Sequence, residues 1–166
     1  MKTRNNVRAI VYDENNGDYR FLLLRARKGF WESPGGGIEE GESDIEAAIR
    51  ETREEAQGLR HLEIIEDTRH YIGFDTEKSG NPIHIDLVTY AVRAPVGSQV
   101  DIATAEGEHS DYQWVSYDEA LSMLTGYVQQ REVFIDVCKM IGIEPTEEQL
   151  RPPKHLGYME QGHKSS

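Results

Sequence analysis

Three glutamates, Glu51, Glu54 and Glu55, stand at spacings that place their carboxylates on one side of a helix. At 100° per residue, the three side chains fall within about one third of the helix circumference. Like charges three and four residues apart destabilise a helix by roughly 0.2–0.5 kcal/mol per pair. Arg50 lies four residues before Glu54, but Glu51 and Glu55 have no Lys or Arg three or four residues away. Because Mg²⁺ prefers oxygen ligands, this pattern suggests a divalent-cation site, whereas a glutamate-rich helix taken alone is more often a solvated acidic face.

The segment around these glutamates has a longer pattern that begins with a glycine turn. Its characteristic residues, in order, are Gly36, Glu42, Arg50, Glu51, Glu54 and Glu55. Their types and intervals resemble the signature box of the Nudix hydrolase family. Two positions depart from that box: Thr52 replaces a hydrophobic residue, and the closing glycine arrives one residue late, at Gly58. Neither departure changes the spacing of the carboxylates.

The resemblance implies a reaction, a cofactor and a set of ligands. The reaction is the attack of water on a phosphoanhydride bond, assisted by Mg²⁺ or alternatively Mn²⁺. The implied metal ligands are Glu51, Glu54 and Glu55, with the backbone carbonyl of Gly36 as a further donor. Arg50 either pairs with Glu46 and Glu54 or orients a ligand carboxylate, and the two roles are compatible.

A further acid, Glu108, opens a second family-like stretch. Residues 108–114, with Glu108, His109, Tyr112 and Trp114, are similar to a motif of two Nudix subfamilies. These are the asymmetrical diadenosine tetraphosphate hydrolases and the dihydroneopterin triphosphate pyrophosphohydrolases. The resemblance makes Glu108 a metal ligand or general base, and its alternative is an ordinary exposed loop acid. The sequence leaves open whether Glu55 or Glu108 activates the water.

Cations and aromatic side chains outside the box provide candidates for substrate binding. Arg25, Arg27 and Lys28 form a basic loop that could clamp phosphates by charge-assisted hydrogen bonds, or could be ordinary solvated charge. Trp31 and Tyr71 could stack on a base, with core packing as the alternative for Trp31. Tyr127 and Arg131 stand where related chains place substrate-side residues between the last helices.

The surrounding pattern predicts the elements that must position these residues. Strands are expected over 7–12, 19–25, 62–68, 70–74, 83–93 and 111–115. Capping boxes at Ser43 and Ser116 predict helices beginning near Asp44 and after Ser116, the latter running to about Leu124. A last helix is expected from about Val128 to Ile141, ending at Gly142. This order agrees with the α/β/α sandwich and mixed sheet that the Nudix resemblance implies.

Composition sets the boundaries of the protein class. With 166 residues, one cysteine and 37% hydrophobic residues, the chain suits one soluble domain without a disulfide framework. We expect a domain at residues 1–143, and a polar, mobile or loosely docked tail at 144–166, where prolines are frequent. The net charge of −12 disfavours a stable nucleic-acid complex. We expect no membrane span, a cytoplasmic location and a monomer or homodimer.

The function predicted is hydrolysis of a small nucleotide, with the exact substrate open. A nucleoside-triphosphate-like substrate is preferred, because Pro34-Gly35-Gly36 lacks the lysine common in this loop of diadenosine tetraphosphate hydrolases. A dinucleoside polyphosphate is the first alternative. A domain that senses a nucleotide without catalysis is the second, although such domains generally lose box carboxylates.

Overall fold

The computed structural model describes residues 1–101 and 109–151, and these residues form a mixed sheet between helices. The strands are β1 (Lys2–Asn15), β2 (Asp18–Ala26), β3 (Trp31–Glu32), β4 (Gly35–Gly37), β5 (Glu63–Lys78), β6 (Asn81–Arg93) and β7 (His109–Val115). The helices are α1 (Asp44–Glu55), α2 (Tyr117–Met123), α3 (Val128–Met140) and α4 (Glu147–Leu150). Within the described residues no helix has the length and apolar character needed to cross a membrane.

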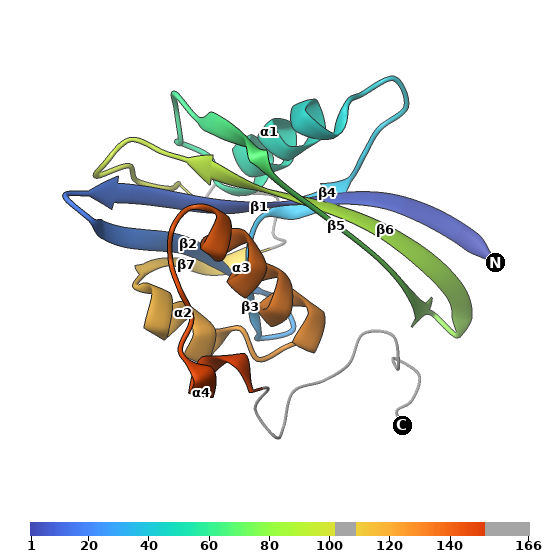
Figure 1. The fold of residues 1–166 in the computed structure, drawn as a ribbon. Helices are drawn as coiled ribbons and strands as arrows, with labels where there is room; N and C mark the ends of the chain where they lie inside the picture. Colours follow the sequence, from blue (N-terminus) through green and yellow to red (C-terminus); the bar gives the residue numbers. More distant parts are fainter. Residues whose placement is uncertain (102–108, 152–166) are drawn as a thin grey trace.

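The sheet is organised around β1. Its main path runs β3-β2-β1-β6-β5, with β4 paired to β1 and β7 paired to β2. The pairing of β1 with β6 is parallel, and the other strand pairs are antiparallel. Figure 1 shows α1 on one side of this sheet and α2, α3 and α4 on the other. The predicted α/β/α sandwich with a mixed sheet is therefore confirmed.

Each face of the sheet has its own apolar core. Val7, Ala9 and Val11 of β1 pack with Ala47 and Ala48 of α1. The alternate β1 residues face the other way, towards the cluster that includes Phe134 and Val137 of α3. Because side chains alternate along a strand, β1 presents its even-numbered side chains to the α3 face and its odd-numbered ones to the α1 face.

Local signals set the ends of several elements as predicted. The first hairpin turns at Asn16 and Gly17, which both have positive φ values of 51° and 88°. This is the conformation that Asn-Gly favours between twisted strands. Ser43 and Ser116 both complete capping boxes at the starts of α1 and α2. Helix α3 ends close to the predicted place, at Met140 before Gly142, whose φ is 101°.

The two departures from the family box are accommodated within this framework. Thr52 is fully buried, and its hydroxyl donates a hydrogen bond to the Ala48 carbonyl at 2.7 Å, so it packs as the usual hydrophobic residue would. Gly58 has a φ of 100°, and a Cβ there would come within 2.9 Å of the Gln99 carbonyl oxygen. The late glycine therefore still provides the left-handed residue after the helix.

Two strand predictions were wrong in extent. The first strand begins at Lys2 instead of Val7, because Lys2 already pairs with Ile83 in the parallel ladder with β6. The strands expected at 62–68 and 70–74 are one strand with a register shift between Ile65 and His70. Thr68 supports that irregularity, since its hydroxyl donates to the Ile65 carbonyl and accepts from the Ala91 amide.

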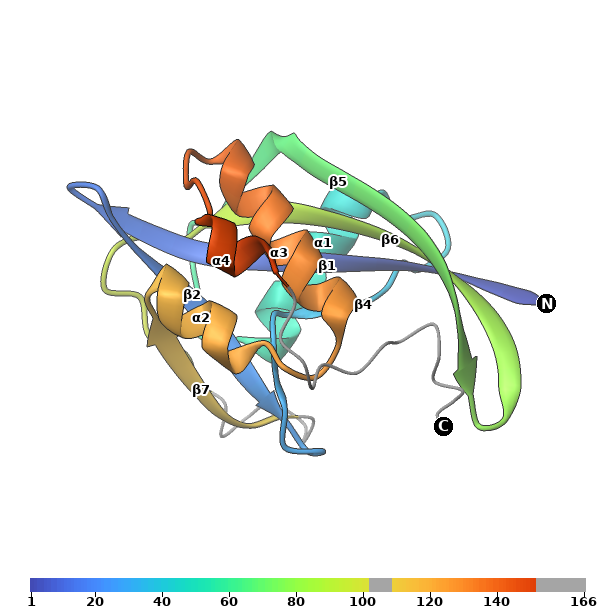
Figure 2. The same ribbon diagram turned by 60° about the horizontal axis from the view of Figure 1, so that its bottom comes forward.

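The described part of the predicted tail includes a docked turn of helix. The short helix α4 begins at a capping box formed by Thr146 and Gln149. The Gln149 side-chain amide donates to Asp118 of α2 at 2.8 Å, and its backbone carbonyl accepts from Arg131 of α3 at 2.7 Å. Figure 2 shows α4 lying against the layer of α2 and α3.

Candidate active site

The acidic side of α1 lies against the glycine strand β4. Gly36 pairs with Val7 of β1, and a Cβ on Gly36 would come within 2.5 Å of both carboxylate oxygens of Glu51. Such an approach is far below van der Waals contact, so no larger residue fits there without displacing Glu51. The glycine is thus required by the close packing of the helix carboxylate on the strand.

Glu55 is tied to the same strand through its carboxylate. Its Oε1 accepts a hydrogen bond from the Gly35 amide at 2.8 Å, and only 8% of the residue is exposed. A hydrogen bond from a backbone amide to a carboxylate is a strong, charge-assisted one. The position of Glu55 therefore depends on the alignment of β4 with the end of α1.

Arg50 connects the acids of the loop with those of the helix. Its guanidinium donates two hydrogen bonds to Glu42, at 2.7 and 2.9 Å, and one to the Gly37 carbonyl at 2.8 Å. Its Nη1 donates to Glu51 at 2.8 Å and to Glu54 at 2.9 Å. One nitrogen thus joins the carboxylates of two predicted metal ligands, which converge on a single cation.

These contacts correct two sequence expectations. Glu51 was expected to be uncompensated, because no Lys or Arg lies three or four residues away, but the side chain of the adjacent Arg50 pairs with it at 2.8 Å. Arg50 was also expected to pair with Glu46. The Oε1 of Glu46 instead accepts from the Ser43 amide in the capping box, while Arg50 pairs with the more distant Glu42.

The pairing with Arg50 lowers the pKa of Glu42 to about 2. The main cause is the hydrogen bond from Arg50, followed by one from the Glu39 amide. A depressed pKa adds stability that is fully present above the ordinary pKa of a glutamate and is lost as the pH falls through the folded value. We therefore expect the unfolding free energy of Glu42→Gln to fall less steeply than that of the wild type as the pH is lowered from about 4.5 to 2.

Denaturant unfolding of both proteins at several pH values measures this effect. Glu40→Gln, an exposed neighbour in the same loop, serves as the control and should keep the wild-type slope. Identical pH slopes for Glu42→Gln and the wild type would contradict the assignment.

The donor chemistry of this cluster fits a hard divalent cation. Glu51, Glu54 and Glu55 offer carboxylate oxygens, and β4 offers backbone carbonyl oxygens, which are the ligand types that Mg²⁺ takes. Within residues 1–101 and 109–151, no three His, Cys, Asp or Glu side chains already have an arrangement that could hold a metal ion. The Arg50 nitrogen on which Glu51 and Glu54 converge marks a point where these carboxylates already surround positive charge. The full ligand set, including Gly36, stays a prediction.

Glu108 lies outside the described residues, but its neighbour His109 is firmly placed. The Nε2 of His109 lies 2.9 Å from Glu32, and the imidazole is almost completely buried. Burial pushes the pKa of Glu32 up, but the hydrogen bond with His109 and the charges of Arg8 and Lys28 outweigh it, so this pKa is lowered. His109 is therefore a structural partner of Glu32 in this structure.

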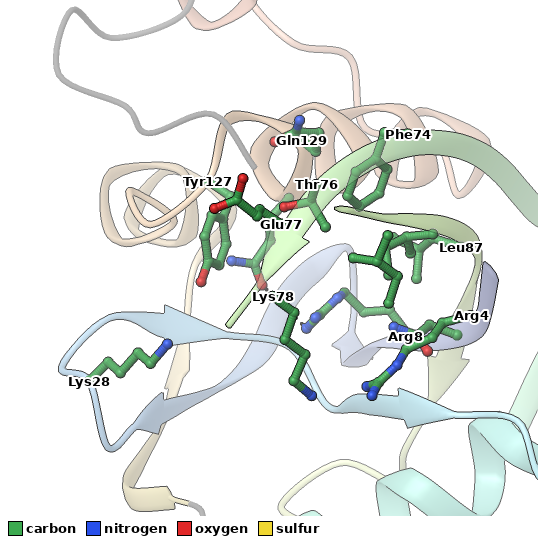
Figure 3. Close-up of a pocket in the computed structure, with 14 residues that line it drawn as sticks. Arg4, Arg8, Lys28, Phe74, Thr76, Glu77, Lys78, Leu87, Tyr127 and Gln129 are labelled. Carbon is green, nitrogen blue, oxygen red and sulfur yellow. Dashed lines mark hydrogen bonds between the residues drawn. The ribbon is translucent and has the colours of Figure 1, made fainter. Parts of the chain in front are cut away.

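A pocket of about 420 Å³ lies on the α3 face of the sheet, close to the glycine strand. Phe74, Ile83, Ile85 and Leu87 of the β5–β6 hairpin provide apolar lining, and Arg4, Arg8, Lys28 and Lys78 provide positive charge. Figure 3 shows the four cationic side chains around the opening, with Phe74 and Leu87 towards one side and Tyr127 on the other. Its volume falls within the range of small-molecule sites.

The pocket and the carboxylates are close neighbours across the sheet. Arg8, which lines the pocket, pairs directly with Gly35, whose amide holds Glu55. Paired residues on adjacent antiparallel strands lie only about 4.5–5.5 Å apart at Cα. Arg8 and Glu55 therefore approach the same β1–β4 strand pair, Arg8 from the pocket on the α3 face and Glu55 from α1.

The structure brings only some of the predicted substrate residues into this pocket. Lys28 and Tyr127 line it, whereas Arg25 and Arg27 are exposed on and after β2. Trp31 is partly buried and packs against the core cluster on the α3 face.

Tyr71 and Arg131 lie elsewhere. Tyr71 is 54% exposed, and its hydroxyl donates to Asp86. Its neighbours Ile72 and Phe74 share the apolar surface of the hairpin that lines the pocket, so Tyr71 faces the opposite side of the sheet. Arg131 is buried and donates to the Gln149 carbonyl of α4.

Sequence reasoning missed Arg4, Arg8 and Lys78. Arg4 and Arg8 are both even-numbered residues of β1, so an alternating pattern extended to Lys2 would have placed them on one face. The signal was missed because the first strand was expected to begin at Val7. Lys78 is far from both arginines in the sequence, and only the pairing of β5, β6 and β1 brings it near.

Comparisons with known proteins agree with the fold. The NUDIX domain family matches residues 2–137. The pig bis(5'-nucleosyl)-tetraphosphatase [asymmetrical] is 33% identical over 122 residues, which cover 70% of this chain and 77% of the relative. An RNA pyrophosphohydrolase from a Nitratiruptor species is 32% identical, covering 74% of this chain and 83% of the relative. A binary complex of the C. elegans Ap4A hydrolase has a similar fold, with a TM-score of 0.68 and 24% identity, covering 83% of this chain and 97% of that one.

Proposed function

The chain belongs to the Nudix family of hydrolases that act on phosphoric anhydrides, and from this premise we propose that it cleaves a dinucleoside tetraphosphate with the help of Mg²⁺. The observation that carries the proposal is the cation-rimmed pocket beside the strand that holds Glu55. The similarity to the pig tetraphosphatase supports this substrate over the nucleoside triphosphate that the Pro34-Gly35-Gly36 loop favoured.

The residues have separate parts in the proposed reaction. Arg8 and Lys28 hold phosphate oxygens by charge-assisted hydrogen bonds, and the apolar side of the pocket takes one nucleoside. Glu51, Glu54 and Glu55 would hold Mg²⁺, or Mn²⁺ in its place, which neutralises phosphate charge and makes water more acidic. Glu55 or Glu108 accepts the proton of the attacking water. Arg50 orients the carboxylates of Glu51 and Glu54.

A substrate panel with Mg²⁺ or Mn²⁺, analysed by mass spectrometry, tests the proposal. Diadenosine tetraphosphate should yield ATP and AMP. Its kcat/KM should be higher than the kcat/KM for hydrolysis of ATP or of a deoxynucleoside triphosphate. A preference for triphosphates, with pyrophosphate and a monophosphate as products, would replace the proposed substrate with the nucleoside triphosphate. Efficient removal of pyrophosphate from 5'-triphosphorylated RNA would instead place the chain with its bacterial relative.

Binding without turnover is the outcome that supports a sensor. Retention of Glu51, Glu54 and Glu55 argues for turnover, because Nudix domains that only sense a nucleotide generally lose these carboxylates. Titration calorimetry with a non-hydrolysable dinucleotide analogue separates binding from catalysis.

A further inference from the structure

The segment between β3 and β4 has few backbone hydrogen bonds of its own. The strand β3 has only two residues, and it is followed by Ser33 and Pro34 before Gly35 begins β4. Proline has no amide proton to donate, although its carbonyl accepts from the Ala9 amide at 2.8 Å. Side chains must therefore help to hold this segment in place.

Gln130 of α3 provides this support with one side-chain amide. Its Oε1 accepts from the Ser33 backbone amide at 3.1 Å, and its Nε2 donates to the Trp31 carbonyl at 3.3 Å. The Trp31 carbonyl and the Ser33 amide are two residues apart, and a peptide group of a neighbouring strand would form the same pair of hydrogen bonds with them. The Gln130 side chain thus replaces a strand partner. Gln130 is 8% exposed, so these bonds are shielded from water.

The same amide also contacts the pocket. Arg8 Nη1 donates to Gln130 Oε1 at 3.4 Å and to the Ser33 carbonyl. Arg8 is thereby held at the wall of the pocket and fastened to the segment that leads into Gly35. Two residues beyond Ser33, the Gly35 amide holds the Glu55 carboxylate.

We infer that Gln130 is a positioning residue. It keeps Arg8, which binds substrate phosphates, in a fixed position relative to the Gly35 amide, which holds Glu55. The inference rests on the proposed function, because it assigns Arg8 to substrate phosphates and Glu55 to catalysis. Gln130 also lines the pocket, and its positioning role is assigned to its hydrogen bonds with the segment of residues 31–35.

The test replaces Gln130 with methionine, which keeps the length of the side chain and removes its hydrogen bonds. We expect Gln130→Met to lower kcat by roughly tenfold or more, because small displacements of catalytic groups are costly. Amide hydrogen exchange, followed by NMR, should accelerate severalfold at Gly35, two residues beyond the Ser33 amide that Gln130 holds. Gln113→Met on β7 is the matched control and should change neither quantity.

A second variant keeps the test decisive if the methionine protein folds poorly. In Gln130→Glu the acceptor for Ser33 is retained, but the carboxylate forms a full ion pair with Arg8. We therefore expect KM to rise by about tenfold and kcat to fall less. A uniform loss of thermal stability, with kcat and KM within about twofold of the wild type in both variants, would overturn the inference.

The result also separates the inference from the proposed function. If the wild type hydrolyses no substrate of the panel, the proposed function fails, and Gly35 exchange in Gln130→Met alone decides the inference. If Gly35 exchange is unchanged while Ser33 exchange accelerates, the segment does not transmit the contact and Gln130 is not a positioning residue for Glu55.

Discussion

Glu55→Gln is expected to lower kcat by roughly 100-fold or more while changing substrate affinity by less than about threefold. A positioned general base typically contributes that factor, and loss of a metal ligand would have a comparable consequence. The fold should be retained, because the glutamine carbonyl oxygen can still accept the hydrogen bond that Glu55 accepts from Gly35. Single-turnover kinetics on the best substrate of the panel, with saturating Mg²⁺, measure the effect.

Three companion variants make this result interpretable. Glu63→Gln removes an exposed carboxylate from the start of β5 and should keep the wild-type rate. Glu51→Gln should slow the reaction and also weaken Mn²⁺ binding by about 10- to 100-fold in calorimetry. Measuring kcat against pH for Glu55→Gln and Glu108→Gln identifies the general base. Loss of the base removes the fall in kcat on the acidic side of the pH–rate profile. Wild-type turnover by both Glu51→Gln and Glu55→Gln would refute the ligand assignment.

Arg50→Met is expected to destabilise the metal-free protein by about 2 kcal/mol, between the small value of an exposed ion pair and the larger value of a buried one. The Arg50 side chain is 23% exposed, and its removal leaves Glu42, Glu51 and Glu54 without the cation that they share. Added Mg²⁺ should restore more stability to the variant than to the wild type, because it neutralises the same carboxylates. Thermal unfolding with and without millimolar Mg²⁺ compares the two shifts.

Arg53→Met provides the matched control for this prediction. Arg53 lies on the same helix and is exposed, so its loss removes an equal charge without disturbing the shared carboxylates. Equal Mg²⁺-dependent shifts in Arg50→Met, Arg53→Met and the wild type would show that Arg50 and the metal do not compete for the same acids.

Local sequence signals predicted the elements around the site with good accuracy. The capping box at Ser43 fixed the start of α1, and helical periodicity placed Ala48 and Thr52 against the sheet. These features depend on interactions over three or four residues, which the order of residues alone specifies. The late Gly58 still ends the helix region, since a left-handed residue is needed near this point and glycine adopts it most readily.

Strand faces were harder to assign because they depend on register. The irregularity between Ile65 and His70 lies within β5, and a shift of one residue exchanges the two faces of a strand. Tyr71 consequently faces away from the pocket that Phe74 lines. Only the pairing with β6 and the support of Thr68 settle this arrangement.

The sequence by itself determined the family resemblance and the acidic side of α1, because both depend on residue types at short spacings. Tertiary structure decided which charges meet. Arg50 reaches Glu42 and Gly37 only because the loop folds back along β4, and Arg8 meets Gln130 across 122 residues. Side-chain partners at such separations are set by strand pairing and helix packing, which no local pattern encodes.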